Sequence, residues 1–349
     1  MRGGLAPLRN TARLRGRVFV RLLVGILVAA GVGVALIAGG FGSQATESVR
    51  SRLLALEKNA RFKEALVERE LMDFDVPLLF AHFPPEGAPV NAKDSDVLAP
   101  IVLVHGTPDT MGAFGPLLFG EGGLAGSHDI YAIEVLGHGM AGGRGEGVTF
   151  QRCAHFVAAA IAELGLSGVT LVGNSYGGEF CWRAALDRPD LIAKLVLIDS
   201  SGLSRAPEEF LPEEVKMREW GFAARLGYLL NSESRVAFAL DPHFDGNAPK
   251  ERTREVFLCL ENRGNWNATI DLARDENGGR SGELNALTQP TLLLFGEHDV
   301  AYPPGTFGAA FERRISDARL VVVKGAGHYP HETRPAEVAA LIDAFARGE

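Results

Sequence analysis

Residues 169–178 read VTLVGNSYGG and contain a Gly-x-Ser-x-Gly motif directly after a short apolar run. The run favours a buried β-strand, and a helical pattern follows the motif. A strand that turns sharply into a helix needs small residues on both sides of the turn, and Gly173 and Gly177 provide them. We therefore expect Ser175 at the apex of the turn, with its hydroxyl above the sheet edge and a helix N-terminus beneath it.

A serine hydroxyl needs a base to act as a nucleophile at neutral pH, and His328 is the preferred candidate. It stands in the Gly-rich segment KGAGHYP, directly after the last predicted strand. A carboxylate must orient this base, and Asp299 follows the penultimate strand in the segment GEHD. Asp199, at the end of an earlier strand, is the rival acid, and its alternative role is to cap a turn. We expect Ser175, Asp299 and His328 to meet at one sheet edge.

A developing oxyanion needs two hydrogen-bond donors. One candidate is the amide of Tyr176, which follows the nucleophile. The other is the amide of Thr107 in the segment HGTPD, which follows a predicted strand. Pro108 has no N–H and stiffens this loop, and His105 is expected to brace it rather than to react.

The rest of the chain alternates short β-branched runs with helical patterns, which predicts an α/β fold with a mostly parallel sheet covered on both faces. Residues 69–83 are expected to add antiparallel strands at one edge. The predicted strands of the parallel part cover residues 101–104, 129–133, 169–172, 195–198, 291–295 and 320–323.

The strand–helix alternation predicts a core from residues 69–202 and 286–349. Residues 203–285 break the alternation and are amphipathic, which predicts an inserted helical cap. Residues 41–68 are charged with periodic apolar positions, and we expect a helical spacer there.

Residues 22–40 are uniformly apolar, and a helix of this length rises about 28 Å, enough to cross a bilayer. Residues 1–21 contain six arginines and no acid, which predicts a cytoplasmic N-terminus and an extracytoplasmic remainder. Two alternatives stay open. One is a signal peptide cleaved after Ala45, which would release a secreted protein, and the other is a buried helix.

Composition and charge argue against several classes of function. The formal net charge is −8, and no basic stripe follows residue 21, so binding to nucleic acid is not expected. Cys153, Cys181 and Cys259 are widely spaced, which fits neither a disulfide framework nor a zinc site. We expect buried free thiols, no metal and no organic cofactor. The oligomeric state is left open.

Five motifs in order resemble the α/β-hydrolase superfamily, in the serine-nucleophile branch with a His-Gly-x-Pro oxyanion loop and a helical cap. The resemblance spans residues from about 70 to 347 and implies an eight-stranded, mostly parallel sheet flanked by helices. It also implies the chain order of nucleophile, acid and base found here. The motifs are HGTP at 105–108, LGHG at 136–139, GNSYGG at 173–178, GEHD at 296–299 and GH at 327–328.

The resemblance implies a serine hydrolase that cleaves a small carboxylic ester or related acyl substrate through an acyl-enzyme on Ser175. Related epoxide hydrolases and dehalogenases carry Asp at the nucleophile position, so serine argues against both activities. A carbon–carbon bond hydrolase of the meta-cleavage-product type would use the same three residues and is the alternative enzyme. An inactive binding module is the alternative of another class, but inactive members generally lose a residue of the triad, and this chain has all three.

Overall fold

The computed structural model describes residues 42–349 except 75, 88–97, 143–146, 206–221 and 278. The chain divides into two compact units, Met1–Gln44 and Ala45–Glu349, and the second holds the fold described here. Among the described residues no helix is both long and apolar enough to cross a bilayer. The predicted membrane span at residues 22–40 lies outside the described residues.

Eight strands form one mixed sheet in the order β1-β2-β4-β3-β5-β6-β7-β8. The two pairings β1–β2 and β2–β4 are antiparallel, and the other five are parallel. The strands are β1 (Leu66–Arg69), β2 (Leu78–Phe83), β3 (Ile101–Val104), β4 (Ile130–Ile133), β5 (Val169–Asn174), β6 (Ile192–Ile198), β7 (Thr291–Gly296) and β8 (Ala318–Val323). Each strand of the parallel part begins within three residues of its predicted start, so the predicted sheet of an α/β hydrolase fold is confirmed.

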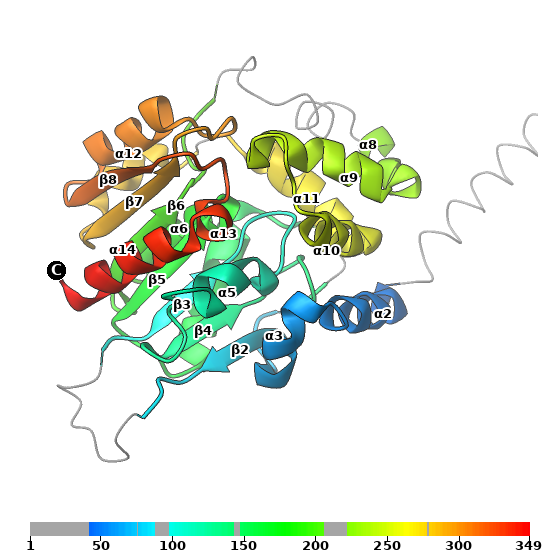
Figure 1. Ribbon diagram of the computed structural model, residues 1–349, viewed down its shortest axis with the longest axis horizontal. Helices are drawn as coiled ribbons and strands as arrows, with labels where there is room; N and C mark the ends of the chain where they lie inside the picture. Colours follow the sequence, from blue (N-terminus) through cyan, green and yellow to red (C-terminus); the bar gives the residue numbers. More distant parts are fainter. Residues whose placement is uncertain (1–41, 75, 88–97, 143–146, 206–221, 278) are drawn as a thin grey trace, which may run out of the picture. The chain divides into compact units, whose positions relative to one another are not determined.

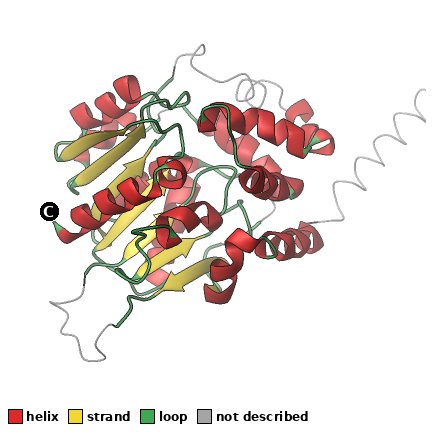
Figure 2. Cartoon of the chain, viewed as in Figure 1, coloured by secondary structure: helices red, strands yellow, loops and turns green. Residues whose placement is uncertain are grey.

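Helices pack on both faces of the sheet, as Figure 2 shows in red against the yellow strands. One core cluster joins α5, α6 and α12 to the sheet through side chains such as Phe156, Phe180 and Phe311. The other core cluster joins α4 and α14 to the side chains on the opposite face of the sheet, and it buries Leu117 and Ile342. These flanking elements are η3 (Met111–Phe114), α4 (Gly115–Phe119), α5 (Phe150–Glu163), α6 (Tyr176–Asp187), η8 (Pro304–Gly308), α12 (Ala309–Arg314), α13 (Pro330–Thr333) and α14 (Pro335–Arg347).

Between β6 and β7, where a helical cap is predicted, the described residues form helices and no strand, and Figure 1 shows α8 to α11 gathered beside the sheet. A small apolar cluster that includes Val236, Leu240 and Val256 packs these helices together and extends to Tyr329 of the core. Asn262 caps the N-terminus of α11, because its side-chain oxygen accepts hydrogen bonds from the amides of Gly264 and Asn265. The elements are α8 (Phe222–Leu226), η5 (Gly227–Leu230), α9 (Glu233–Leu240), η6 (Asp241–Phe244), α10 (Lys250–Glu261), α11 (Arg263–Asp275) and η7 (Ser281–Ala286).

The segment predicted as a helical spacer is largely helical, and its apolar side chains join the core. It contains α2 (Gly42–Leu54), η1 (Glu57–Asn59) and α3 (Ala60–Ala65), and β1 begins before the segment ends. The apolar side chains Val49, Leu53 and Phe62 are buried in the same cluster as the sheet. Burial of these side chains stabilises the segment against the domain, so from Ala45 onward it belongs to the same compact unit.

Candidate active site

Ser175 sits at a strained turn between β5 and α6. Its backbone has φ 55° and ψ −124°, in the positive-φ region that residues other than glycine rarely adopt. A Cβ on Gly173 would come within 2.4 Å of Gly177 O, and one on Gly177 would meet the carbonyl of Val104 at the same distance. Both positions therefore exclude any larger residue, as the sequence predicted, and Ser175 is left 7% exposed.

Asp299 and His328 meet after β7 and β8. Nδ1 of His328 lies 2.9 Å from Oδ2 of Asp299, and both side chains are buried. The other carboxylate oxygen of Asp299 accepts the N–H of Ala301 at 2.8 Å. Burial raises the pKa of Asp299, but the facing His328 and these hydrogen bonds outweigh it and hold the pKa at about 2. Asp299 is therefore an ionised acceptor that fixes the proton of His328 on Nδ1 and leaves Nε2 free to accept one.

Two residues that sequence reasoning missed hold the His328 loop in place. The amide of His328 donates to the carbonyl of His243 in the cap, at 3.1 Å. Asn174, inside the nucleophile motif, donates through Nδ2 to the carbonyls of Ile198 and His328, at 3.1 and 3.4 Å. The position of Asn174 between the strand end and the nucleophile was the available signal. No pattern in the sequence pointed to His243, because its contact to His328 is made by its backbone carbonyl.

The predicted oxyanion loop lies against the nucleophile. A Cβ built on Gly106 would be 3.0 Å from Cβ of Ser175, so the loop after β3 touches the serine directly. Thr107 follows Gly106 in the chain, and Tyr176 follows Ser175 as the first residue of α6. The backbone amides of Thr107 and Tyr176 are therefore adjacent in the chain to the two residues that touch. The hydroxyl of Thr107 donates to Nε2 of His138 at 2.5 Å, which anchors the loop to the segment after β4.

His105 and His138 brace this loop. Nδ1 of His105 donates to its neighbour Gly106 at 2.8 Å, and Nε2 accepts the amide of Val135 at 3.1 Å. Burial lowers the pKa of His138 to about 3, so its ring is neutral and Nδ1 donates to the carbonyl of Leu136. The assignment of His105 as a bracing residue agrees with these contacts.

The rival acid Asp199 does not make the contact to His328 that Asp299 makes. Its Oδ1 accepts the amide of Gly296 at 2.8 Å, and its side chain is fully buried. The structure therefore brings Asp299, rather than Asp199, to the base. Ser175, Asp299 and His328 follow β5, β7 and β8, at the carboxyl ends of parallel strands where ligands bind in open α/β sheets.

Within the described residues, one group has metal-ligand character: His243, Asp299 and His328, whose nearest ligand atoms lie within 4.8 Å of one another. The hydrogen bond between Asp299 and His328 accounts for two of its three members. The described cysteines are buried and free, with no spacing for a metal site. The contacts of this group thus describe an acid–base pair with a cap histidine beside it.

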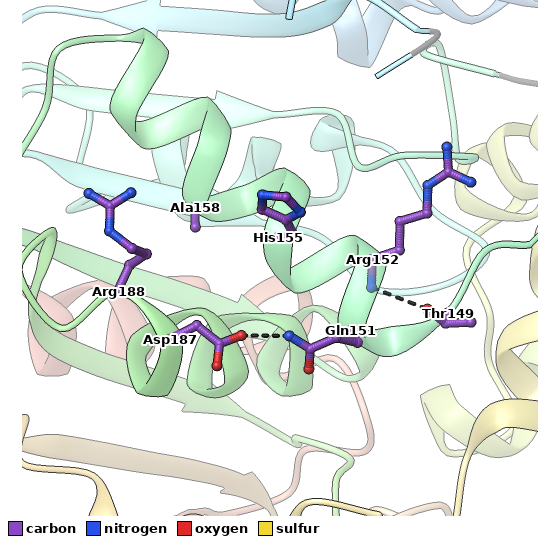
Figure 3. A pocket seen from close by; sticks show the side chains of 7 residues that line it. All are labelled: Thr149, Gln151, Arg152, His155, Ala158, Asp187 and Arg188. Atoms are coloured by element: carbon purple, nitrogen blue, oxygen red, sulfur yellow. Dashed lines mark hydrogen bonds between the residues drawn. The ribbon is translucent and has the colours of Figure 1, made fainter. Parts of the chain in front are cut away.

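A hollow of about 450 Å³ lies elsewhere on the surface, between α5 and the far end of α6 (Figure 3). The side chain of Gln151 donates to Asp187 across it at 2.5 Å. Asp187 is the last residue of α6, about 16 Å along the helix from its first residue, Tyr176. The hollow is therefore separate from the nucleophile. Its lining consists of Thr149, Gln151, Arg152, His155, Ala158, Asp187 and Arg188.

The chain belongs to the alpha/beta hydrolase family, whose model matches residues 101–341. It is 22% identical over 264 residues to a Mus musculus protein described as sn-1-specific diacylglycerol lipase ABHD11, covering 73% of this chain and 83% of that one. It is 24% identical over 271 residues to a 2-hydroxymuconate semialdehyde hydrolase of Pseudomonas putida, covering 74% and 91%. A thermophilic esterase from Thermogutta terrifontis has the same fold, with a TM-score of 0.65, 22% identity and coverage of 81% and 98%.

Proposed function

We propose that this hydrolase cleaves a carboxylic ester or related acyl substrate through an acyl-enzyme on Ser175. The observation that carries the proposal is the 2.9 Å contact between Asp299 and His328, at the sheet edge that also presents Ser175 on a strained turn. A nucleophile, a base and an acid that orients the base are the parts that acyl transfer needs. Relatives described as a lipase and an esterase support an ester substrate.

In the proposed reaction, Oγ of Ser175 attacks the substrate carbonyl while Nε2 of His328 takes the hydroxyl proton. The amides of Thr107 and Tyr176 bind the oxyanion, and Asp299 stabilises the imidazolium that forms. His328 then gives its proton to the leaving alcohol as the tetrahedral intermediate collapses to the acyl-enzyme. Water, deprotonated by His328, attacks the ester carbon of the acyl-enzyme. As the second tetrahedral intermediate collapses, His328 returns this proton to Oγ of Ser175, and the acid is released.

We further propose that residues 22–40 anchor the enzyme in a membrane, with the catalytic domain on the extracytoplasmic side. An uninterrupted apolar run preceded by six arginines supports this topology. Anchoring would confine the enzyme to the surface where acyl lipids are concentrated.

A fluorophosphonate probe tests the nucleophile. The full-length protein is expected to be labelled at Ser175, while a folded Ser175→Ala variant is not labelled and loses about 10³ or more in kcat. Full activity of that variant would overturn the mechanism, and an unlabelled wild-type protein would favour the inactive binding module.

A substrate panel separates the two enzyme alternatives. We expect turnover of p-nitrophenyl esters, with a preference for one range of acyl chain lengths. The Pseudomonas putida relative and the GNSYGG motif support testing a dienone ring-cleavage product in parallel. Cleavage of the dienone without ester turnover would replace the ester proposal by carbon–carbon bond hydrolysis.

A further inference from the structure

A second buried carboxyl group, that of Asp199, is fixed to the strand that carries Asp299. Asp199 directly follows β6, has no exposed surface and adopts φ 43°. Its amide donates to Leu294 at 2.9 Å, and its Oδ1 accepts the amide of Gly296 at 2.8 Å. The carbonyl of Gly296 in turn accepts the amide of Asp299 at 3.2 Å. One residue at the end of β7 therefore connects the two aspartates through the backbone.

The carboxyl groups of Asp199 and Asp299 lie within hydrogen-bonding reach of each other. Both oxygens of Asp299 already accept hydrogen bonds, one from Ala301 and one from His328. Oδ2 of Asp199 is buried, and no N–H or O–H group of the described residues donates to it. Two ionised carboxylates cannot form a hydrogen bond, because both are acceptors only. A hydrogen bond between the two groups therefore requires one proton, and Oδ2 of Asp199 is the carboxyl oxygen of the pair that accepts no other hydrogen bond.

We propose that Asp199 is a positioning residue that remains protonated at neutral pH and donates a hydrogen bond to Asp299, which fixes the Asp299 carboxylate against His328. This inference deepens the proposed function, because it assigns a fourth side chain to the same site. It also gives the rival acid a role that differs from both turn capping and direct contact with the base.

The electrostatics of the pair agree with this assignment. Burial raises the pKa of Asp199 well above its ordinary value, and the negative charge of Asp299 raises it further. The pKa of Asp299 stays at about 2 because His328 faces it. When two carboxyl groups interact this closely, the pair keeps one proton over a wide pH range. Here the asymmetry of the surroundings places that proton on the residue farther from the base.

The neutral side chain of Asn reproduces the proposed state of Asp199. Its Oδ1 can accept from Gly296 and its Nδ2 can donate to Asp299, and Asn tolerates positive φ. We expect Asp199→Asn to keep kcat/KM within about threefold of wild type, because a hydrogen bond of the same kind is retained. Asp199→Gly fits the backbone but removes the donor, and we expect it to lower kcat/KM by about 10-fold to 100-fold, since a hydrogen bond to a charged group is lost.

Rates are normalised to the sites that a fluorophosphonate probe titrates, so that loss of folded protein is not counted as loss of rate. Asp199→Asn that is as inactive as Asp299→Asn would overturn the proposal and make Asp199 an ionised acid. Full activity per titrated site in Asp199→Gly would also overturn it, because a purely structural residue would change stability alone. If the glycine variant does not fold, Asp199→Ala replaces it.

Infrared spectroscopy tests the protonation state without turnover. Burial raises the pKa values of Glu179 and Glu332 to about 7, so we expect both carboxyl groups to be ionised at pH 9. We expect a protonated-carboxyl band in the full-length wild-type protein that is absent from Asp199→Asn and present in Ser175→Ala and Glu179→Gln. Absence from wild type, at pH 7 as well as at pH 9, of any band that Asp199→Asn removes would overturn the proposal. Because the band does not depend on activity, its presence in a protein without hydrolase activity would contradict the proposed function and leave the proton assignment standing.

Discussion

At the residue scale, the proposed mechanism depends on the contact between Asp299 and His328. Asp299→Asn keeps the shape of the side chain but presents an N–H where the imidazole needs an acceptor, so the wrong tautomer is favoured. We expect kcat to fall by about 10²–10⁴ with the fold intact. The matched control is Asp190→Asn, since Asp190 is an exposed aspartate paired with Arg188. Steady-state kinetics that show a silent Asp299→Asn beside an inactive Asp199→Asn would reverse the two roles.

A second residue-scale prediction concerns Glu179, which is buried on α6. Burial raises its pKa from 4.5 to about 7, although the guanidinium of Arg183 lowers it. The folded protein therefore binds more protons than the unfolded chain between these values, and the unfolding free energy falls as pH rises through this window. Glu179→Gln stays neutral and should be spared this loss, which is at most about 3–4 kcal/mol at about 1.4 kcal/mol for each pKa unit.

Urea unfolding at pH 5 and at pH 8 measures this effect as the difference between wild type and Glu179→Gln. Glu163→Gln, at an exposed position on α5, is the control and should follow wild type at both pH values. Parallel behaviour of wild type and Glu179→Gln would show that Glu179 does not titrate in this window.

At the scale of elements, one buried arginine fastens the cap to the core. Arg252 on α10 pairs with Glu332 of α13 at 2.9 Å, with Glu255 at 3.2 Å and with Asp109 of the oxyanion loop. Lys58 also pairs with Glu255, at 2.5 Å. Removing one partner from a buried ion network leaves the remaining charges uncompensated. We expect Arg252→Met to lower the unfolding free energy by about 3–5 kcal/mol.

Arg254 on the same helix provides the matched control. It pairs with Glu233, and both side chains are largely exposed. Arg254→Met should change the unfolding free energy by less than about 1 kcal/mol, because exposed ion pairs contribute little. Chemical denaturation of both variants makes the comparison, and equal losses would show that burial of the network is not what makes Arg252 important.

The elements differ in how far the sequence could predict them. The strand before Ser175 was recognisable because a buried parallel strand is a continuous apolar run with a glycine turn behind it. Asp299 and His328 were recognisable because a parallel sheet brings the carboxyl ends of its strands together. The network around Arg252 was not, because its members lie in distant segments and no local pattern shows which charges are buried. The same holds for His243, which contributes a backbone carbonyl.

At the scale of the whole molecule, the proposed membrane span at residues 22–40 would determine where the enzyme works. Helix α2 begins at Gly42 and is continuous to Leu54, and Thr46 accepts a hydrogen bond from Asn262 at 3.0 Å. Cleavage of a signal peptide after Ala45 would fall inside the first turn of this helix. We expect an uncleaved anchor rather than a cleaved signal because the apolar run of residues 22–40 is longer than the roughly 7–15 residues usual for the apolar region of a signal peptide.

We therefore predict that the full-length protein stays in the membrane and exposes its catalytic domain on the extracytoplasmic side. Alkaline carbonate washing should leave it in the membrane pellet, because an apolar span of about 28 Å is held by the bilayer and not by charge. Protease added to spheroplasts should reach the hydrolase domain, because the six arginines before residue 22 keep the N-terminus inside. The control is a variant with these arginines replaced by Gln, whose orientation should become mixed. A soluble product that begins at Thr46 would show a cleaved signal peptide. Full protection of the domain from protease would reverse the orientation and restrict the enzyme to substrates on the cytoplasmic side.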